Sequence, residues 1–254
     1  MRKRLRKMGL ISDQTGILSR YIREEHNWLN HLNNTKQFIL DCLSQNNAET
    51  ISVFGSGWLL DLPEQLLSER SYKKVVLYDL HHPVEVKRKF RNYHHIFFEE
   101  IDLTGGLIEK VYLMTKKRGS FSEEKIITES ENLKVNLPIE TDYYISLNIL
   151  NQLDILIIDY LKSRIKISDT TILKLRKLIQ ANHRELLKKN KSCLVTDYEE
   201  LSINKNGDVV GTKTLVHIKL PEGKRIKKWM WKFDTQKTYH PGFNTYFNVI
   251  GIEI

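Results

Sequence analysis

Length, composition and charge exclude several classes of protein before any motif is considered. The chain has 254 residues, of which 41% are hydrophobic and 28% charged, proportions typical of a globular α/β domain. Apolar runs such as residues 155–158 are far shorter than the roughly 18 residues of a membrane span, and no apolar segment follows the basic N-terminus. Cys42 and Cys193 provide neither a disulfide framework nor zinc-ligand spacing. We therefore expect a cytoplasmic protein with no secretory signal and no membrane partner.

The net charge of +9, from 40 basic and 31 acidic residues, leaves two interpretations open. A basic surface can bind nucleic acid by releasing counterions from the phosphates. Lysines that merely coat solvated helix faces give the same total, and this interpretation is favoured. A nucleic-acid partner is therefore open but not favoured.

The first 46 residues predict a helical extension that packs on the core. Ser12 and Asp13 can cap one helix, and residues 33–35 interrupt the pattern and can cap a second, so a helical pair is expected. Residues 47–254 form the remaining part of a single domain. The domain begins with a short apolar run, residues 51–54, followed by the turn Gly55-Ser56-Gly57 and by apolar residues at helical intervals. This strand, glycine turn and helix would offer a cofactor or anion site.

Further strands alternate with helices and end in polar residues. Strands are predicted at residues 73–79, 94–101, 143–150 and 192–197, and helices at 83–91, 107–115, 148–162 and 169–189. The polar residues at the strand ends are Asp79, Asp102, Ser146, Asn148 and Asp197. Because parallel strands share one rim at their carboxyl ends, these groups are expected to gather there. Asp79 lies 22 residues after Gly57, a spacing typical of a ribose-binding carboxylate, although it could also cap the next helix.

From residue 208 the helical period disappears. Residues 212–220, 225–234 and 244–254 predict antiparallel strands joined by Pro-Gly turns. Residues 224–232 interleave cations with tryptophans, which suits either a base-stacking face or a strand that packs its tryptophans, the second being favoured. Residues 116–138 are polar and weakly patterned, and they could form a lid or an inert insertion.

Several chemistries are not expected. The paired histidines at 81–82 and 94–95 would point to opposite faces of a strand, so no metal site is predicted. The nucleophile elbow, the phosphate-binding loop and the CxxC and HExxH motifs are all missing from the sequence.

The combination of glycine turn, strand-end acids and antiparallel C-terminal strands resembles the class I S-adenosylmethionine-dependent methyltransferases. The turn is similar to the bacterial branch that carries G-x-G-x-x-x-D-L-P, matched here from Gly55 to Pro63. The likeness covers about residues 47–254 and implies a Rossmann-like, mostly parallel sheet in the order 3-2-1-4-5 with helices on both faces. It departs from the family where Val53 and Phe54 replace an acid before the turn. The fourth strand also lacks the Asn/Asp-Pro-Pro-Tyr run of enzymes that methylate amide or nucleobase nitrogens.

The resemblance implies a cofactor, S-adenosyl-L-methionine, and a contact for each part of it. The turn would approach the methionine portion, the end of the second strand the ribose, the end of the third the adenine, and the end of the fourth the methyl group. The implied cofactor-binding residues are Gly55, Ser56, Gly57, Asp79, Leu80, Asp102, Leu103, Ser146 and Asn148.

Methyl transfer requires chiefly alignment, since the sulfonium is already a good leaving group. Candidates for a base are Tyr144, Asp197 and His240, each of which could instead be a core tyrosine, a helix cap or a turn histidine. The expected function is methyl transfer to an unidentified acceptor. The alternative is a non-catalytic protein of the same fold that binds S-adenosylmethionine or a nucleoside, or that associates with nucleic acid.

Overall fold

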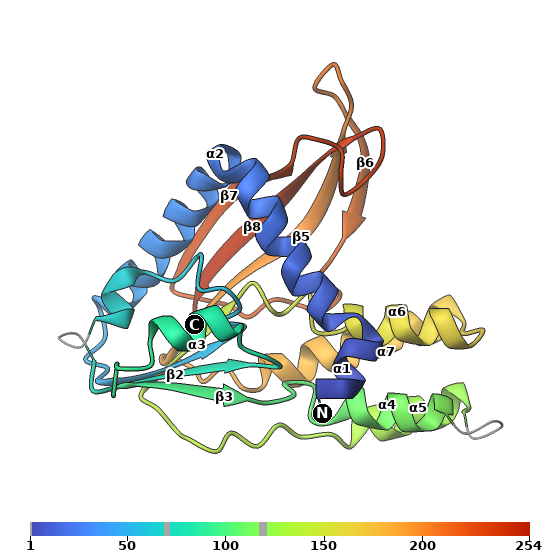
Figure 1. Cartoon of the computed structure of the whole chain (residues 1–254), viewed down its shortest axis with the longest axis horizontal. Helices are drawn as coiled ribbons and strands as arrows, with labels where there is room; N and C mark the ends of the chain where they lie inside the picture. Colours follow the sequence, from blue (N-terminus) through green and yellow to red (C-terminus); the bar gives the residue numbers. More distant parts are fainter. Residues whose placement is uncertain (1, 69–71, 117–120) are drawn as a thin grey trace.

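One mixed sheet of eight strands organises the chain (Figure 1). The computed structural model describes residues 2–68, 72–116 and 121–254. The strand order is β3-β2-β1-β4-β5-β8-β7, with β6 paired to β5 off this path. The strands are β1 (Thr50–Phe54), β2 (Lys74–Asp79), β3 (Ile96–Glu100), β4 (Tyr143–Leu147), β5 (Ser192–Ile203), β6 (Val209–Thr214), β7 (Arg225–Asp234) and β8 (Asn244–Glu253).

The first five strands in this order are parallel and the last three antiparallel, as predicted. Helices cover both faces because both faces of these strands are apolar. In β1, Ile51 and Val53 contact one cluster of buried residues and Phe54 contacts another. One face carries α2 (Leu10–Leu43), the 3-10 turn η1 (Glu64–Leu67) and α3 (Val84–Lys89). The other face carries α1 (Arg2–Met8), α4 (Leu107–Lys116), α5 (Glu123–Glu131), α6 (Ile155–Arg164) and α7 (Asp169–Arg184).

The predicted break at residues 33–35 is wrong, because α2 is one helix from Leu10 to Leu43. Thr35 is fully buried and Asn34 donates to the carbonyl oxygen of Asn30, one turn earlier. Tertiary packing of the apolar side therefore outweighs the weak local preference of these residues. Figure 1 shows that α2 is bent: its second half lies along β7 and its first half returns toward the parallel strands.

The helix predicted directly after the glycine turn is also absent. Residues 57–62 form turns, and only the short η1 follows. Leu59 has a φ of 61° and Pro63 is extended, and neither conformation continues an α-helix. The turn consequently has no helix N-terminus behind it, and the expected contribution of a helix dipole to anion binding is lost.

Residues 116–138, for which a lid and an inert insertion were both open, contain the end of α4 at Lys116 and the whole of α5. Ser122 caps α5, and Ile126 and Ile127 are buried in the same cluster as the apolar side of α7. The Glu123 carboxylate accepts a hydrogen bond of 2.8 Å from the backbone N–H of Ser168. Residues 117–120 lie outside the described residues.

Beyond the rim, β5, β8 and β7 continue as an antiparallel extension (Figure 1). The α2 helix packs on this extension through aromatic side chains. Trp231 stacks on His31 with ring centroids 3.9 Å apart, and Trp229 Nε1 donates to His31 Nδ1 at 3.1 Å. The tryptophans of β7 therefore pack against a helix, which confirms the favoured interpretation of residues 224–232.

Candidate functional site

The parallel strands end at a common rim, and the first half of α2 covers part of it. Gln14 Nε2 donates to the carbonyl oxygen of His81 at 2.9 Å, just after β2. Trp58 Nε1 donates to the carbonyl oxygen of Gln14, also at 2.9 Å. The N-terminal half of α2 thus bridges the ends of β1 and β2. A ligand on this part of the rim would contact the helix as well as the sheet.

Gly55 and Gly57 differ in the space that surrounds their Cα atoms. Gly55 has a φ of +81°, and a Cβ atom there would lie 2.6 Å from Ile149 Cβ and 2.7 Å from the carbonyl oxygen of Leu147. Gly57 has a φ of +45°, and a Cβ there would meet nothing within 4 Å. Gly55 is therefore needed for packing against the loop after β4. Gly57 leaves open space beside the backbone.

Asp79 is held against this turn. Its Oδ2 accepts the Gly57 N–H at 2.8 Å, and its Oδ1 lies 3.5 Å from the backbone N of His81. Burial raises the pKa of Asp79, and these backbone donors oppose the shift. The N-cap of α3 is Pro83, without a side-chain cap, so Asp79 does not cap that helix. Gly57 and Asp79, predicted from a sequence spacing, are thus in direct contact.

Asp102 anchors the loop that leads into α4. Its Oδ1 accepts from Thr104 N at 2.9 Å and from Thr104 Oγ1 at 2.6 Å, while Oδ2 lies 3.3 Å from Ile108 N. Burial raises the pKa of Asp102, and the Thr104 hydrogen bonds oppose that effect. Leu103 is buried in the core, whereas Leu80 is only partly buried at the end of β2. Most of the acceptor capacity of Asp102 is therefore used within its own loop.

At the β4–β5 end of the rim, two carboxylates accept hydrogen bonds from side-chain amides. Asn148, at a φ of 48°, donates from Nδ2 to Asp61 Oδ2 at 2.7 Å. Asn151 donates from Nδ2 to Asp197 Oδ2 at 3.1 Å. Burial, and then the charge of Asp61, raise the pKa of Asp197 to about 7. Burial also raises the pKa of Asp61. We call Asp61, Asn148, Asn151 and Asp197 the acid–amide cluster.

Three predicted residues are not on the open rim. Ser146 is fully buried and its Oγ lies 2.8 Å from His183 Nε2, toward α7. Tyr144 is equally buried, and its hydroxyl accepts from Thr141 N at 3.4 Å, which places it toward the amino end of β4 and excludes it as a base at the methyl group. Ser56 is buried, with its Oγ 3.4 Å from His82 Nδ1.

The last base candidate, His240, lies with the antiparallel extension. Its Nε2 is 2.8 Å from Glu200 Oε1. Glu200 is in β5 beyond Asp197, so this contact places the histidine on the extension. Sequence reasoning did not select Asp61 or Asn151 as site residues. The signal for Asp61 was its place in the Asp-Leu-Pro segment after the turn, which had served only to mark a branch of the family.

The histidine pair at residues 81–82 is held by neighbouring groups at the end of β2. His81 Nδ1 pairs with Glu100 at 3.1 Å, and burial lowers the pKa of His82 to about 4. No group of three or more His, Cys, Asp or Glu side chains suited to a metal ion occurs among residues 2–68, 72–116 and 121–254. Over the same described residues, no helix is both long and apolar enough to cross a membrane.

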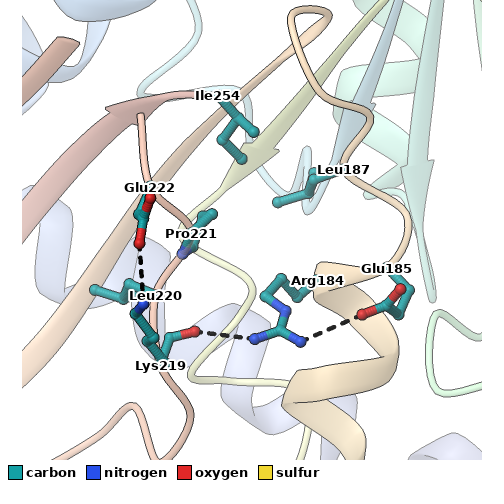
Figure 2. A pocket seen from close by; sticks show the side chains of 8 residues that line it. All are labelled: Arg184, Glu185, Leu187, Lys219, Leu220, Pro221, Glu222 and Ile254. Carbon is teal, nitrogen blue, oxygen red and sulfur yellow. Dashed lines mark hydrogen bonds and ion pairs between the residues drawn. The ribbon is translucent and has the colours of Figure 1, made fainter. Parts of the chain in front are cut away.

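A cavity of about 350 Å³ lies away from the rim (Figure 2). It is next to Ile254, whose N–H bonds to Ser192 at the amino end of β5. Its charged lining is already paired, with Arg184 3.3 Å from Glu185 and Lys219 3.0 Å from Glu222. The cavity therefore lies at the amino ends of the parallel strands, and the polar groups lie at their carboxyl ends.

Comparison with protein-family models and with curated proteins finds no match to this chain. The assignment of a function consequently depends on the geometry of the rim.

Proposed function

We propose that the chain is an S-adenosyl-L-methionine-dependent methyltransferase whose cofactor binds on the rim between β2 and β4. The observation that carries the proposal is the contact between Asp79 Oδ2 and the Gly57 N–H at 2.8 Å, in a sheet of order 3-2-1-4-5. This contact places a partly exposed carboxylate beside a glycine whose side-chain direction is open. Nucleoside ligands of open α/β sheets bind at such a switch in strand order, with an acid on the ribose hydroxyls.

The residues present suit the parts of this cofactor. Asp79 Oδ1, which lies 3.5 Å from the backbone N of His81, has capacity left to accept from a ribose hydroxyl. Leu80 offers a partly exposed apolar side chain for the base, and Gly57 allows close approach of the methionine portion. The cofactor would supply an electrophilic methyl group, and the chain would supply alignment and exclusion of water.

The alternative is a protein that binds the same ligand without transferring the methyl group. Burial of the β7 tryptophans against α2 removes the observation that had suggested base stacking, so nucleic acid is not proposed as the partner. Binding and transfer are separable by experiment. The binding test comes first because both versions of the proposal require it.

Calorimetric titration with S-adenosylhomocysteine tests the pocket directly. Asp79→Asn should weaken binding about ten- to a hundredfold, because the variant loses a charge-assisted acceptor for the ribose. Glu140→Gln is the matched control: its side chain is 85% exposed before β4, and affinity should not change. Thermal unfolding checks that both variants fold. Equal affinity of Asp79→Asn and the unchanged protein, or no binding of S-adenosylhomocysteine at millimolar concentration, contradicts the proposal.

A further inference from the structure

The acid–amide cluster leaves buried acceptors without donors. Each amide donates its N–H to one carboxylate oxygen, as described above, and the Asn151 Oδ1 accepts from Thr196 Oγ1 at 3.4 Å. Asn148 Oδ1 and Asp197 Oδ1 are buried and have no hydrogen-bond partner in the part of the chain that the structure describes. Asn148 and Asp197 are only 9% and 3% exposed. Since buried polar atoms are nearly always paired, these two oxygens are placed to accept from a ligand or from a bound water molecule.

The charge of the cluster indicates what kind of donor fits. Asp61 and Asp197 lie close enough that the charge of one disfavours ionisation of the other. The neighbouring acid on β5, Glu200, already has His240 at 2.8 Å and Lys213 at 3.6 Å. Facing the cluster from α2, Lys36 is the cation that favours the charged form of Asp61. A primary ammonium group carries positive charge, three donors and no acceptor, and it matches a site made of acceptors and excess acid.

Building on the proposed function, we propose that Asp61, Asn148 and Asp197 bind the methyl acceptor through a primary alkylammonium group. In the strand order, Asp79 and Asp197 are separated by β1 and β4. At a spacing of about 4.8 Å between neighbouring strands, their strands are about 14 Å apart. That separation lets a nucleoside occupy one end of the rim and an amine the other, with the sulfonium between them.

The cluster also supplies the proton acceptor that an ammonium substrate needs. Asp197 takes one proton from the ammonium nitrogen through Oδ1, which restores the nitrogen lone pair. The amine nitrogen then forms a bond to the methyl carbon while the carbon–sulfur bond breaks and its electron pair remains on sulfur. The product is a methylated ammonium, a neutral thioether and a protonated Asp197. Asp61 and Asn148 position the nitrogen and undergo no bond change.

Two other cations could satisfy the same oxygens. The methionine portion of the cofactor has its own ammonium group, and a divalent metal accepts carboxylate and amide oxygens. The test therefore uses n-butylamine as the probe and n-butanol as a neutral probe of the same length. Binding of each is measured by saturation-transfer NMR, with and without saturating S-adenosylhomocysteine and with and without millimolar Mg²⁺.

The amine should bind at least tenfold more tightly than the alcohol. Asp197→Asn and Asp61→Asn should each weaken amine binding about ten- to a hundredfold, and Glu140→Gln should not change it. S-adenosylhomocysteine should leave amine affinity within about threefold, because the two ligands occupy different ends of the rim. If one variant fails to fold, the other variant and the amine-to-alcohol ratio on the unchanged protein decide.

Four results would overturn the inference: equal affinity for amine and alcohol, insensitivity to both Asn substitutions, displacement of the amine by S-adenosylhomocysteine, or displacement by Mg²⁺. Displacement by S-adenosylhomocysteine assigns the cluster to the cofactor, and displacement by Mg²⁺ assigns it to a metal. The proposed function fails separately. Amine binding without S-adenosylhomocysteine binding overturns the methyltransferase, whereas the reverse result overturns only the amine site.

Discussion

The two ends of the rim hold their carboxylates in different ways. On the β2–β3 end, Asp79 and Asp102 accept from backbone N–H groups of the turns beside them. On the β4–β5 end, Asp61 and Asp197 accept from the side-chain amides of Asn148 and Asn151. A backbone N–H donor fixes the loop that carries it and adds no side-chain acceptor to the site. Amide donors bring an oxygen with them: the oxygen of Asn151 accepts from Thr196 Oγ1, and the oxygen of Asn148 remains available to a ligand.

This difference also separates structural from chemical roles. Burial raises the pKa of the carboxyls at both ends, but at the β2–β3 end several backbone donors oppose the shift. Asp197 has one amide donor and a second acid nearby, and its pKa rises to about 7. A carboxyl that titrates near neutral pH can take and return a proton. A well-anchored carboxylate is better suited to fixing a hydroxyl group.

The largest expected effect comes from disrupting the close packing of the glycine turn against the loop after β4. Gly55→Ala should destabilise the fold by about 3 to 5 kcal/mol, since the new Cβ collides with Ile149 and the Leu147 carbonyl in a left-handed conformation. Gly57→Ala is the matched control, with positive φ but open space, and should cost only about 1 kcal/mol. Urea unfolding measures both free energies. Equal losses would mean that the close approach of the turn to the β4 loop is unimportant.

The second prediction concerns Asp197, the carboxyl at the β4–β5 end whose pKa is raised by burial. The pKa of Asp197 in the folded chain, about 7, is above the unfolded value of 3.8. Its contribution to stability is therefore full below about pH 4 and is lost as the pH rises through 7. In Asp197→Asn this pH dependence of the free energy of unfolding is absent. Between pH 4 and 8 the variant should gain about 2 to 4 kcal/mol relative to the unchanged protein.

Denaturant unfolding at a series of pH values measures this gain. Glu140→Gln, an exposed acid at the other edge of the sheet, should follow the unchanged protein at every pH. Parallel curves for Asp197→Asn and the unchanged protein would show that Asp197 ionises normally. The proton-accepting role assigned to it would then be lost.

The sequence predicted the sheet well because its signals are local. Apolar runs bounded by turns located the five parallel strands, and the loss of helical period located β7 and β8. The strand predicted at residues 212–220 overlaps β6, Val209–Thr214, only in part. The expectation that strand-end residues share one rim is confirmed for Gly57 and Asp79, which are in contact. These features depend on strand alternation and on the rule that parallel strands share a rim.

The errors arise where tertiary packing decides. Nothing local shows that Thr35 is buried, so α2 was divided in two. Leu59 adopts a left-handed conformation that its residue type disfavours, so a helix was expected where a turn occurs. The fourth strand ends at Leu147 and not at residue 150, which places Ser146 inside the strand with its side chain toward α7. Asp61 was missed as a site residue because its partner, Asn148, is 87 positions away.

The smallest expected effect comes from removing one donor to Asp102 at the β2–β3 end of the rim. Thr104→Val preserves the shape of the side chain but removes the O–H donor that lies 2.6 Å from Asp102 Oδ1. The loss of this hydrogen bond should cost about 1 kcal/mol in urea unfolding at pH 7. The cost should shrink as the pH is lowered and Asp102 is protonated, because the Thr104 hydroxyl holds the pKa of Asp102 down against burial. Thr128→Val, at an exposed position on α5, should change stability by less than about 0.5 kcal/mol. If Thr104→Val is as neutral as Thr128→Val, the backbone donors alone anchor Asp102, and the contrast between the two ends depends on the backbone and not on the threonine hydroxyl.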